Sequence, residues 1–450
     1  MSRTVKIEPY SGPAGGWGSV RSLARHLVSE HARPDAVTAL ASQNKPDGFA
    51  CVSCAWAKPA KPHIAEFCEN GAKATFWELT KDRATPAFFA DHTVTELRTW
   101  SDHDLEMAGR LTHPMRYDAA TDRYVEVSWE DAFEAIGAEL KRLRAEDPRS
   151  VVFYASGRAS LETSYMYALF ARMYGNNNLP DSSNMCHEST SVALPQSIGV
   201  PVGTVTLDHF AKTDGIFFFG QNVGVNAPRM LHQLQDASER GATIVTFNPL
   251  RERGLERFTD PQDPVQMATG GETQISEAYF QVRPGGDIAA IAGMCKWLLA
   301  EDDRAVDEGR ERILDAAFLE EHTHGFEAFR AFVEAQDWAD LERESGLSRE
   351  QIEDAARRYA ACEAVIGVYG MGLTQHKLGV DAVQMVVNLL LLRGHIGKPG
   401  AGLCPVRGHS NVQGQRTVGI TEKPALAPLD KLRALYGFEP PREKGVTTVE

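Results

Sequence analysis

The sequence lacks the features that mark several classes of protein. It carries 61 Asp and Glu against 47 Lys and Arg, a formal net charge of −14, and it has no dense basic tract, which argues against nucleic acid as a partner. No apolar run reaches the length of a membrane span; the best candidate, residues 383–392, is short and interrupted by Asn388. The first ten residues have neither the apolar core of a secretory signal nor paired arginines. These absences predict a cytoplasmic protein.

Cysteine is also scarce, with seven residues in a chain of 450. An odd, small number of cysteines in a long intracellular chain favours metal or redox chemistry over a disulfide framework. The length is too great for one simple core and predicts two to three domains.

The first cysteine motif is Cys51-Val-Ser-Cys54, with Cys68 further along the chain. This spacing brings two sulfurs onto one metal centre through a tight turn, and a remote third cysteine closes the site. An iron–sulfur cluster, a zinc site with His63 as fourth ligand, a redox dithiol and a metal-free pair are all compatible with these residues. The proline- and lysine-containing segment after the motif disfavours the dithiol, which would need a helix there.

A second cysteine lies in the polar stretch Asp181–Leu194, where Cys186 is followed by His187. Turn-forming residues before this pair and an apolar run after it predict a loop leading into a helix. A helix N-terminus favours the thiolate of a nearby cysteine, and the adjacent imidazole can share or relay a proton. The alternative is that Cys186 is a small buried apolar residue.

Strand–loop–helix units repeat along the chain and predict a parallel sheet between helices. Strand ends rich in Gly and Asn expose amides to ligands at one edge of such a sheet. The expected strands are 150–155, 215–220, 243–247 and 364–370, and the expected helices are 20–31, 129–145, 161–174, 229–240, 288–300, 348–361 and 380–393.

Other segments have weaker patterns. The glycine cluster at 12–18 predicts a loop in a flexible or wrapping N-terminal extension, and 259–276 predicts a surface insertion. Short strands are expected around the turn at 118–122. Asp287 is suited either to accept hydrogen bonds from a ligand ring or to cap the helix that follows.

The closing segment, residues 394–419, is glycine-rich and polar, and a loop of this length in a compact domain is usually functional. It contains Arg407, whose planar, always charged guanidinium suits a small carboxylate or a phosphate. The alternative for Arg407 is a structural or surface role.

Three C-terminal segments resemble the molybdopterin-dependent formate dehydrogenases: G-M-G-L-T-Q-H (370–376), L-R-G-H-I-G-K-P-G-A-G-L (392–403) and P-V-R-G-H-S-N-V-Q-G (405–414). The C-x-x-C motif and the Cys186-His187 pair follow the order of that family. Where the sequence differs from those enzymes, it resembles a branch of the family, the formate-dehydrogenase-like oxidoreductase alpha subunits, some of which are linked to bacterial acid resistance. The resemblance covers residues 45 to 450.

The resemblance implies a multi-domain α/β molybdopterin oxidoreductase with parallel-sheet αβα domains and a small N-terminal iron–sulfur domain. The expected domains are 1–110, 111–181 with 410–450, and 182–409, and a C-terminal cofactor-binding domain is expected to be absent. The implied cofactors are a molybdenum bis(molybdopterin guanine dinucleotide) and a [4Fe–4S] cluster.

The resemblance also assigns roles to residues. Cys186 occupies the position of the family's molybdenum ligand, and His187 that of the histidine beside it. Arg407 occupies the position of the arginine that orients substrate. Cys51, Cys54 and Cys68 stand at cluster ligands. The cofactor-cradling positions are Gly220, Asn222, Asn226, Asn248, Asp287, Gly370, Met371, Gly372, Gln375, Gly408 and Asn411.

Some positions depart from the family pattern. Lys58 stands where a third cluster cysteine is usual, and Asn70, with Lys73 nearby, stands where a lysine joins cluster and pterin. Cys186 is followed by H-E-S-T-S rather than H-G-P-S-V.

The expected function is oxidation of a small substrate such as formate, with electrons passing through the cluster to an acceptor protein or subunit. The alternatives are a molybdoenzyme for another substrate and a truncated, non-catalytic metal-binding or partner subunit.

Overall fold

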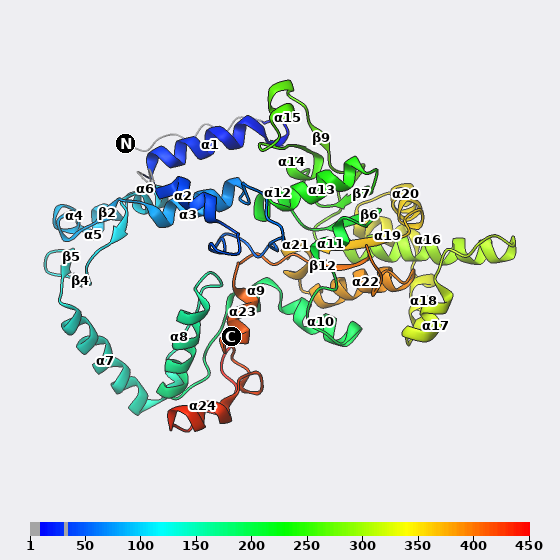
Figure 1. Ribbon diagram of the computed structural model, residues 1–450. Helices are drawn as coiled ribbons and strands as arrows, with labels where there is room; N and C mark the ends of the chain where they lie inside the picture. The colour runs from blue at the N-terminus through cyan, green and yellow to red at the C-terminus, as the bar shows by residue number, and fades with distance from the viewer. Residues whose placement is uncertain (1–9, 31–34) are drawn as a thin grey trace.

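The centre of the molecule is a five-stranded, wholly parallel sheet, seen in a computed structural model that describes residues 10–30 and 35–450 (Figure 1). Its strand order is β10 (Ala278–Phe280), β7 (Thr243–Phe247), β6 (Gly215–Phe219), β11 (Val365–Tyr369) and β12 (Gly402–Pro405). β6 and β11 are buried along their whole length, as is usual for parallel strands covered on both faces.

Helices cover both faces of this sheet. Successive side chains of a strand point to opposite sides, and in the central strands the side chains on both sides are apolar. Phe217 and Phe219 of β6 pack into the larger core, whereas Ile216 and Phe218 pack into the smaller one. The larger core includes α10 (Glu188–Ile198), α16 (Asp287–Asp307), α19 (Trp338–Ser345), α20 (Arg349–Ala360) and α22 (Gly379–Leu391). The smaller core includes α11 (Leu207–Phe210), α12 (Val223–Asn226), α13 (Met230–Glu239) and α14 (Arg253–Glu256).

The α/β prediction is confirmed in its central units. The strands expected at 215–220, 243–247 and 364–370 correspond to β6, β7 and β11, and α8 (Leu161–Tyr174) has the expected bounds. α16 is longer than expected and continues to Asp307.

The strand expected at 150–155 is wrong, since only an isolated bridge joins Ala155 to Asp181. The backbone groups of this apolar run are satisfied by an asparagine cluster instead of a neighbouring strand. The side chains of Asn176 and Asn178 donate to the Val151 carbonyl at 3.0 and 3.1 Å. Side-chain amides that satisfy backbone carbonyls in this way replace the hydrogen bonds of a neighbouring strand.

The N-terminal region contacts the sheet domain through a small second sheet. β1 (Ala14–Gly15) pairs with β8 (Arg257–Thr259), which pairs with β9 (Thr273–Gln274). A Cβ on Gly15, whose φ is +82°, would lie 2.3 Å from the Thr259 carbonyl, so glycine permits this close pass. The loop expected at 12–18 is therefore partly strand and helix, and 259–276 contributes structure rather than a free surface insertion.

The rest of this region is helical, with one short parallel pair. α1 (Gly16–Ser29) and α3 (Glu69–Leu79) pack around Phe76. The remaining elements are α2 (Asp35–Ser42), β2 (Arg83–Ala84) paired with β3 (Arg110–Leu111), α4 (Pro86–Asp91), α5 (Val94–Leu97) and α6 (Asp102–Met107).

A further group of elements lies to one side of the sheet (Figure 1). β4 (Met115–Asp118) and β5 (Arg123–Glu126) form the expected hairpin, and the Ser128 side chain caps α7 (Trp129–Glu146). Phe153, Ala168 and Ile420 share a core, which joins α8 to the segment around α23 (Val412–Thr417) and α24 (Leu429–Tyr436). These contacts support the grouping of 111–181 with 410–450, whose bounds we retain as a proposal.

The remaining short elements are η1 (Pro148–Ser150), α9 (Ser182–Cys186), α15 (Pro264–Thr269), α17 (Ala316–His322), α18 (Phe326–Glu334), α21 (Met371–Thr374) and η2 (Pro424–Leu426). Within residues 10–30 and 35–450, no helix has both the length and the apolar character needed to cross a membrane.

Candidate active site

The carboxyl ends of the parallel strands meet at one edge of the sheet, where most of the predicted site residues lie. Gly220 follows β6 and Gly372 lies just after β11, and the two backbones touch: the Gly372 N–H donates to the Gly220 carbonyl at 3.1 Å. A Cβ on Gly372 would lie 2.4 Å from that carbonyl oxygen. Only glycine allows the two strand ends to approach this closely.

The loop after β6 is held by Gln221, a buried residue that the sequence analysis did not single out. Its Nε2 donates to Asn226 Oδ1 at 2.8 Å, and a Cβ on Gly370 would lie 1.7 Å from its Oε1. Asn222 precedes α12 and makes no side-chain cap. The side chain of Gln221 therefore joins the ends of β6 and β11.

Two further predicted residues at this edge differ in exposure. Asn248, directly after β7, is 9% exposed, and its side chain donates to the Leu250 carbonyl at 2.7 Å. Met371 is 37% exposed. Met371 thus remains accessible at the rim of the edge.

Cys186 is the last residue of the short helix α9, which precedes α10. Asp181 and Asn184 form a capping box that fixes the start of α9. The Thr374 hydroxyl donates to the Cys186 carbonyl at 2.6 Å, and Gln375 Nε2 donates to the Met185 carbonyl at 3.0 Å. The loop after β11 therefore holds the cysteine in place.

Cys186 does lie just before a helix N-terminus, since α10 begins at Glu188 with His187 as its N-cap, but burial opposes the thiolate that this position was expected to favour. The residue ends α9, and its side chain is only 5% exposed. Burial raises the pKa of the thiol, against the opposing effects of the Gly408 backbone N–H and the Arg407 charge. The thiol is therefore the favoured form in the protein without a bound metal, and metal coordination would deprotonate it.

His187 is fully buried, and both of its ring nitrogens have partners in the chain. Nε2 lies 3.0 Å from the Val406 carbonyl, to which it must donate, and Nδ1 lies 3.1 Å from the Thr190 hydroxyl. Thr190 in turn bonds Tyr369 at 3.0 Å. Burial, followed by the Arg407 charge, lowers the pKa of His187 to about 3. These partners hold a neutral imidazole rather than one free to relay a proton.

Arg407 lies two residues after β12, and its side chain is 7% exposed. Burial lowers the pKa of the guanidinium, and the Tyr369 and Cys186 groups oppose that shift. Within the described part of the chain, its one hydrogen bond is 3.4 Å long, from Nη2 to the Pro201 carbonyl. A cavity of about 140 Å³ beside it is also lined by Trp56 and Gln413. The guanidinium is thus a buried charge with most of its donors available.

The residues after Arg407 connect separate regions. The Gly408 carbonyl accepts from the Ala55 N–H at 3.2 Å, next to Cys54, while the Gly408 N–H faces the Cys186 sulfur. Asn411 precedes α23, and its side chain donates to the Ala159 carbonyl at 2.9 Å. Gly408 therefore lies between the two groups of cysteines.

Asp287 is the first residue of α16 and is 6% exposed. One of its carboxylate oxygens is buried without a partner among the described residues. Burial raises the pKa of this carboxyl to about 6, and the His376 charge opposes the shift. An acceptor left unsatisfied inside the protein indicates room for a ligand that donates.

Cys51, Cys54 and Cys68 lie near enough to one another that the charges of Cys54 and Cys51 act on the Cys68 thiol. A Cβ on Gly71 would lie 2.9 Å from the Cys51 sulfur and 3.7 Å from the Cys68 sulfur, so both sulfurs face this glycine. Burial raises the pKa of Cys68 to about 12, against the opposing Gly71 N–H, and burial also raises that of Cys54. In the part of the chain that the structure describes, no three His, Cys, Asp or Glu side chains are placed to hold a single metal ion.

The other residues considered for this centre have different partners. His63 lies on the surface, and its Nδ1 accepts from the Ala65 N–H at 3.2 Å. Lys73 forms an ion pair with Glu69, and the Asn70 side chain donates to the Val225 carbonyl. Asn70 thereby joins the start of α3 to α12.

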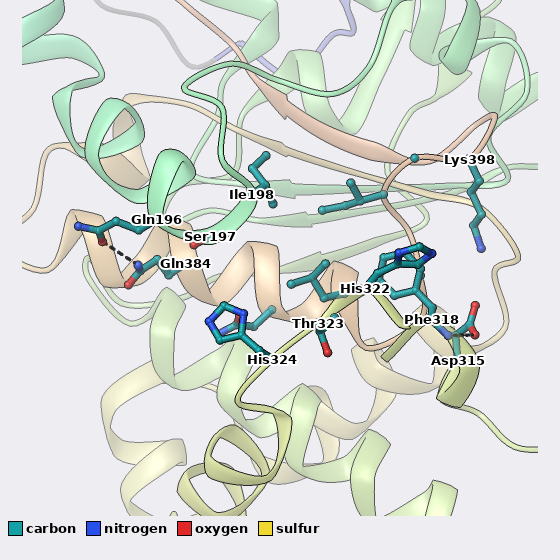
Figure 2. A pocket seen from close by; sticks show the side chains of 15 residues that line it. Gln196, Ser197, Ile198, Asp315, Phe318, His322, Thr323, His324, Gln384 and Lys398 are labelled. Carbon is teal, nitrogen blue, oxygen red and sulfur yellow. Dashed lines mark hydrogen bonds between the residues drawn. The ribbon is translucent and has the colours of Figure 1, made fainter. Parts of the chain in front are cut away.

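A separate cavity of about 870 Å³ lies near the ends of α10 and α22, beside the segment that leads into β12 (Figure 2). Gln196 and Gln384 meet at its wall through a hydrogen bond of 3.1 Å. It lies toward the amino end of β12, whereas Arg407 follows the carboxyl end. None of the predicted site residues lines it.

Comparisons with known proteins show which family and fold the chain resembles. A family model described as molybdopterin oxidoreductase matches residues 110–428. The chain is 52% identical over 440 residues to protein YdeP of Escherichia coli (strain K12), which covers 98% of this chain and 58% of that protein. It is 29% identical over 313 residues to formate dehydrogenase H of the same strain, covering 69% of this chain and 40% of that protein.

Among solved structures, the fold is similar to that of acetylene hydratase from Pelobacter acetylenicus. The TM-score is 0.51 at 19% identity, over 65% of this chain and 36% of that chain. The chain thus spans little more than half the length of YdeP, and a smaller share of the other two proteins.

Proposed function

The chain belongs to the molybdopterin oxidoreductase family, and on that premise we propose a formate-dehydrogenase-like activity. A small substrate, with formate the first candidate, is oxidised at molybdenum held by two molybdopterin guanine dinucleotides. Cys51, Cys54 and Cys68 would hold a [4Fe–4S] cluster, which would supply the route by which electrons reach an acceptor protein or subunit. The observation that carries the proposal is that the Cys186 sulfur faces Gly408, the residue directly after Arg407, and that both Cys186 and Arg407 are buried at the carboxyl edge of the sheet.

Several features at this edge fit a bound dinucleotide. The close contact of Gly220 and Gly372 leaves the strand ends free of side chains, so backbone amides can approach phosphates. The unsatisfied carboxylate of Asp287 can accept from ring N–H groups such as those of guanine. Gln375, Asn226 and Asn248 border the same edge.

Cys186 fits the role of metal ligand, because a thiolate is a soft ligand. When bound, a molybdenum–pterin centre supplies two-electron redox chemistry next to this sulfur. The chain's part is to fix the sulfur, which it does through Thr374 and Gly408. His187 positions the cysteine relative to Arg407, since its ring bonds the Val406 carbonyl directly before that arginine.

Arg407 fits the role of substrate-binding residue. Burying a cation is costly, so an anion placed directly against the guanidinium is stabilised. The adjacent cavity of about 140 Å³ has room for a small molecule and not for a nucleotide. A carboxylate held by the guanidinium fork would thus be oriented beside the Cys186 sulfur.

The N-terminal cysteines fit the ligands of a cluster. The sulfurs of Cys51 and Cys68 both face Gly71, and in a cluster each cysteine binds a different iron. The hydrogen bond from Ala55 to Gly408 joins this centre to the substrate site. That short connection supports electron transfer between the two.

One observation supports a substrate other than formate. Glu188, in the H-E-S-T-S segment, accepts from Arg416 at 2.6 Å and from Lys423 at 2.8 Å. Arg416 also bonds Asp181, the cap of α9. This ion-pair group forms a charged wall behind Cys186, and we propose related small acids as the second substrate class.

Metal analysis of anaerobically purified protein tests the proposal. We expect about one molybdenum and about four iron atoms per chain. Cys186→Ala should lose turnover and molybdenum while it retains iron. Cys295→Ala, a buried cysteine of α16, is the matched control and should retain both. Zinc in place of iron, or activity in Cys186→Ala, would contradict the assignments.

A further inference from the structure

Gln43 is a buried residue whose side-chain amide points toward the N-terminal cysteines. It is 0% exposed, and its Nε2 has no hydrogen-bond partner among the described residues. A buried amide donor left unpaired destabilises the folded state, because it has lost its hydrogen bonds to water without replacing them. Such a group indicates a partner that is bound at this place in the working protein.

The position of Nε2 is defined by Gly71. A Cβ on Gly71 would lie 2.8 Å from Gln43 Nε2 and 2.9 Å from the Cys51 sulfur, with the Cys68 sulfur at 3.7 Å. The amide nitrogen and the two sulfurs therefore surround the same glycine. The other end of the amide is held, since Oε1 lies 3.2 Å from the Thr75 hydroxyl.

The backbone beside Gln43 is fixed to both cysteine segments. Asn44 adopts a left-handed conformation, with φ of 59°. Its Oδ1 accepts from the Cys51 N–H at 3.0 Å, and its Nδ2 donates to the Glu66 carbonyl at 2.8 Å, two residues before Cys68. Asn44 thus ties the C-x-x-C segment, the Cys68 segment and Gln43 into one rigid unit, which accounts for an otherwise unfavourable backbone conformation.

We propose that Gln43 donates a hydrogen bond to a sulfur atom of the metal centre at Cys51 and Cys68, and thereby sets its reduction potential. This inference rests on the iron–sulfur assignment made above. Thiolate and sulfide sulfurs accept hydrogen bonds, and a donor stabilises the more negative, reduced state of the centre. Gln43 therefore raises the potential.

Two substitutions remove the donor while keeping the side chain's bulk: Gln43→Leu and Gln43→Met. Each should retain iron and sulfide yet show a lower midpoint potential in a redox titration followed by electron paramagnetic resonance. We expect about a tenfold change in the reduction equilibrium, which is about 59 mV for a one-electron couple. Gln235→Leu is the matched control, because this buried glutamine already has chain partners for its Nε2; its potential should not change.

The outcomes separate the two levels of inference. An unchanged potential in both Gln43 variants, with the cluster intact, would overturn the hydrogen bond and leave the cluster assignment standing. A parent protein that binds no iron–sulfur cluster would overturn that assignment, and this inference with it. If Gln43→Leu fails to fold, Gln43→Met, with its unbranched side chain of similar length, gives the deciding value.

Discussion

The imidazole of His187 donates to the carbonyl of Val406 at 3.0 Å, across 219 positions of sequence. This bond joins the residue after Cys186 to the residue before Arg407. It fixes the distance between the thiol and the guanidinium, on which the proposed chemistry depends. Because both residues are buried, the bond is protected from water.

Removing this imidazole should destabilise the fold. His187→Ala leaves the Val406 carbonyl without its donor, and we expect a loss of about 1–3 kcal/mol in the free energy of unfolding, measured in urea. His395→Leu is the control, because both nitrogens of that buried ring have no partner among the described residues. His395→Leu should change the free energy of unfolding little. An equal loss of stability in His187→Ala and His395→Leu would contradict the role of the His187 bond.

Arg407 should control the binding of small carboxylates. Charge-assisted hydrogen bonds contribute about 1.5–3 kcal/mol, so Arg407→Ala should raise the Kd for formate about ten- to hundredfold in calorimetric titration. Arg407→Lys keeps the charge but loses the planar fork, so its Kd for formate should lie between those of the parent and Arg407→Ala. The exposed Arg142→Ala should bind as the parent does. An unchanged Kd in Arg407→Ala would argue against formate as substrate.

Asp287 should reduce stability at neutral pH in the protein without its cofactor. Its pKa of about 6 in the folded state lies above the unfolded value of about 3.9, so the folded state binds the proton more tightly. Stability therefore falls as pH rises from about 4 to about 6, and the full penalty, about 3 kcal/mol, remains above that range. Asp287→Asn should be more stable than the parent at about pH 8 and equal to it at about pH 4.

Asp302 provides the opposite control. It is 0% exposed, and although burial alone would raise the pKa of its carboxyl, Arg312 and two backbone N–H groups lower it overall. Asp302→Asn should therefore lose stability at neutral pH. A gain in both variants would show that the effect at Asp287 does not come from its unsatisfied carboxylate.

The contact between the ends of β6 and β11 should tolerate no side chain. Gly372→Ala would place a methyl group 2.4 Å from the Gly220 carbonyl, and we expect a loss of about 1–3 kcal/mol in urea unfolding. Gly137→Ala in α7 meets nothing within 4 Å and should instead gain about 0.5–1 kcal/mol. A Gly372→Ala protein as stable as the parent would mean that the strand ends can separate.

The central strands could be predicted because their signals are local. Each of β6, β7 and β11 is a short apolar run bounded by turn-forming residues, and such runs form buried parallel strands. The run at 150–155 has the same pattern but forms no strand, because asparagines more than twenty positions away take its hydrogen bonds. The amino acids at 150–155 and their immediate neighbours do not show that these distant asparagines will take the hydrogen bonds.

The candidate site divides in the same way. The sequence supplied its chemical groups: the cysteines, Arg407, and the glycines at strand ends. Gln43, Asn44, Gln221 and Thr374 were missed, because glutamine, asparagine and threonine are common in loops and nothing nearby marks them. Only Thr374 lay inside a recognised segment, G-M-G-L-T-Q-H.

By itself, the sequence determined which reactive groups exist and in what order they occur, because these are properties of single residues and short motifs. The tertiary structure decided their state. It buried Cys186 between the end of α9 and the start of α10, satisfied both nitrogens of His187, and left Arg407, Asp287 and Gln43 buried with donors or acceptors to spare. Burial and long-range hydrogen bonds depend on distances in space, which separation along the chain does not fix.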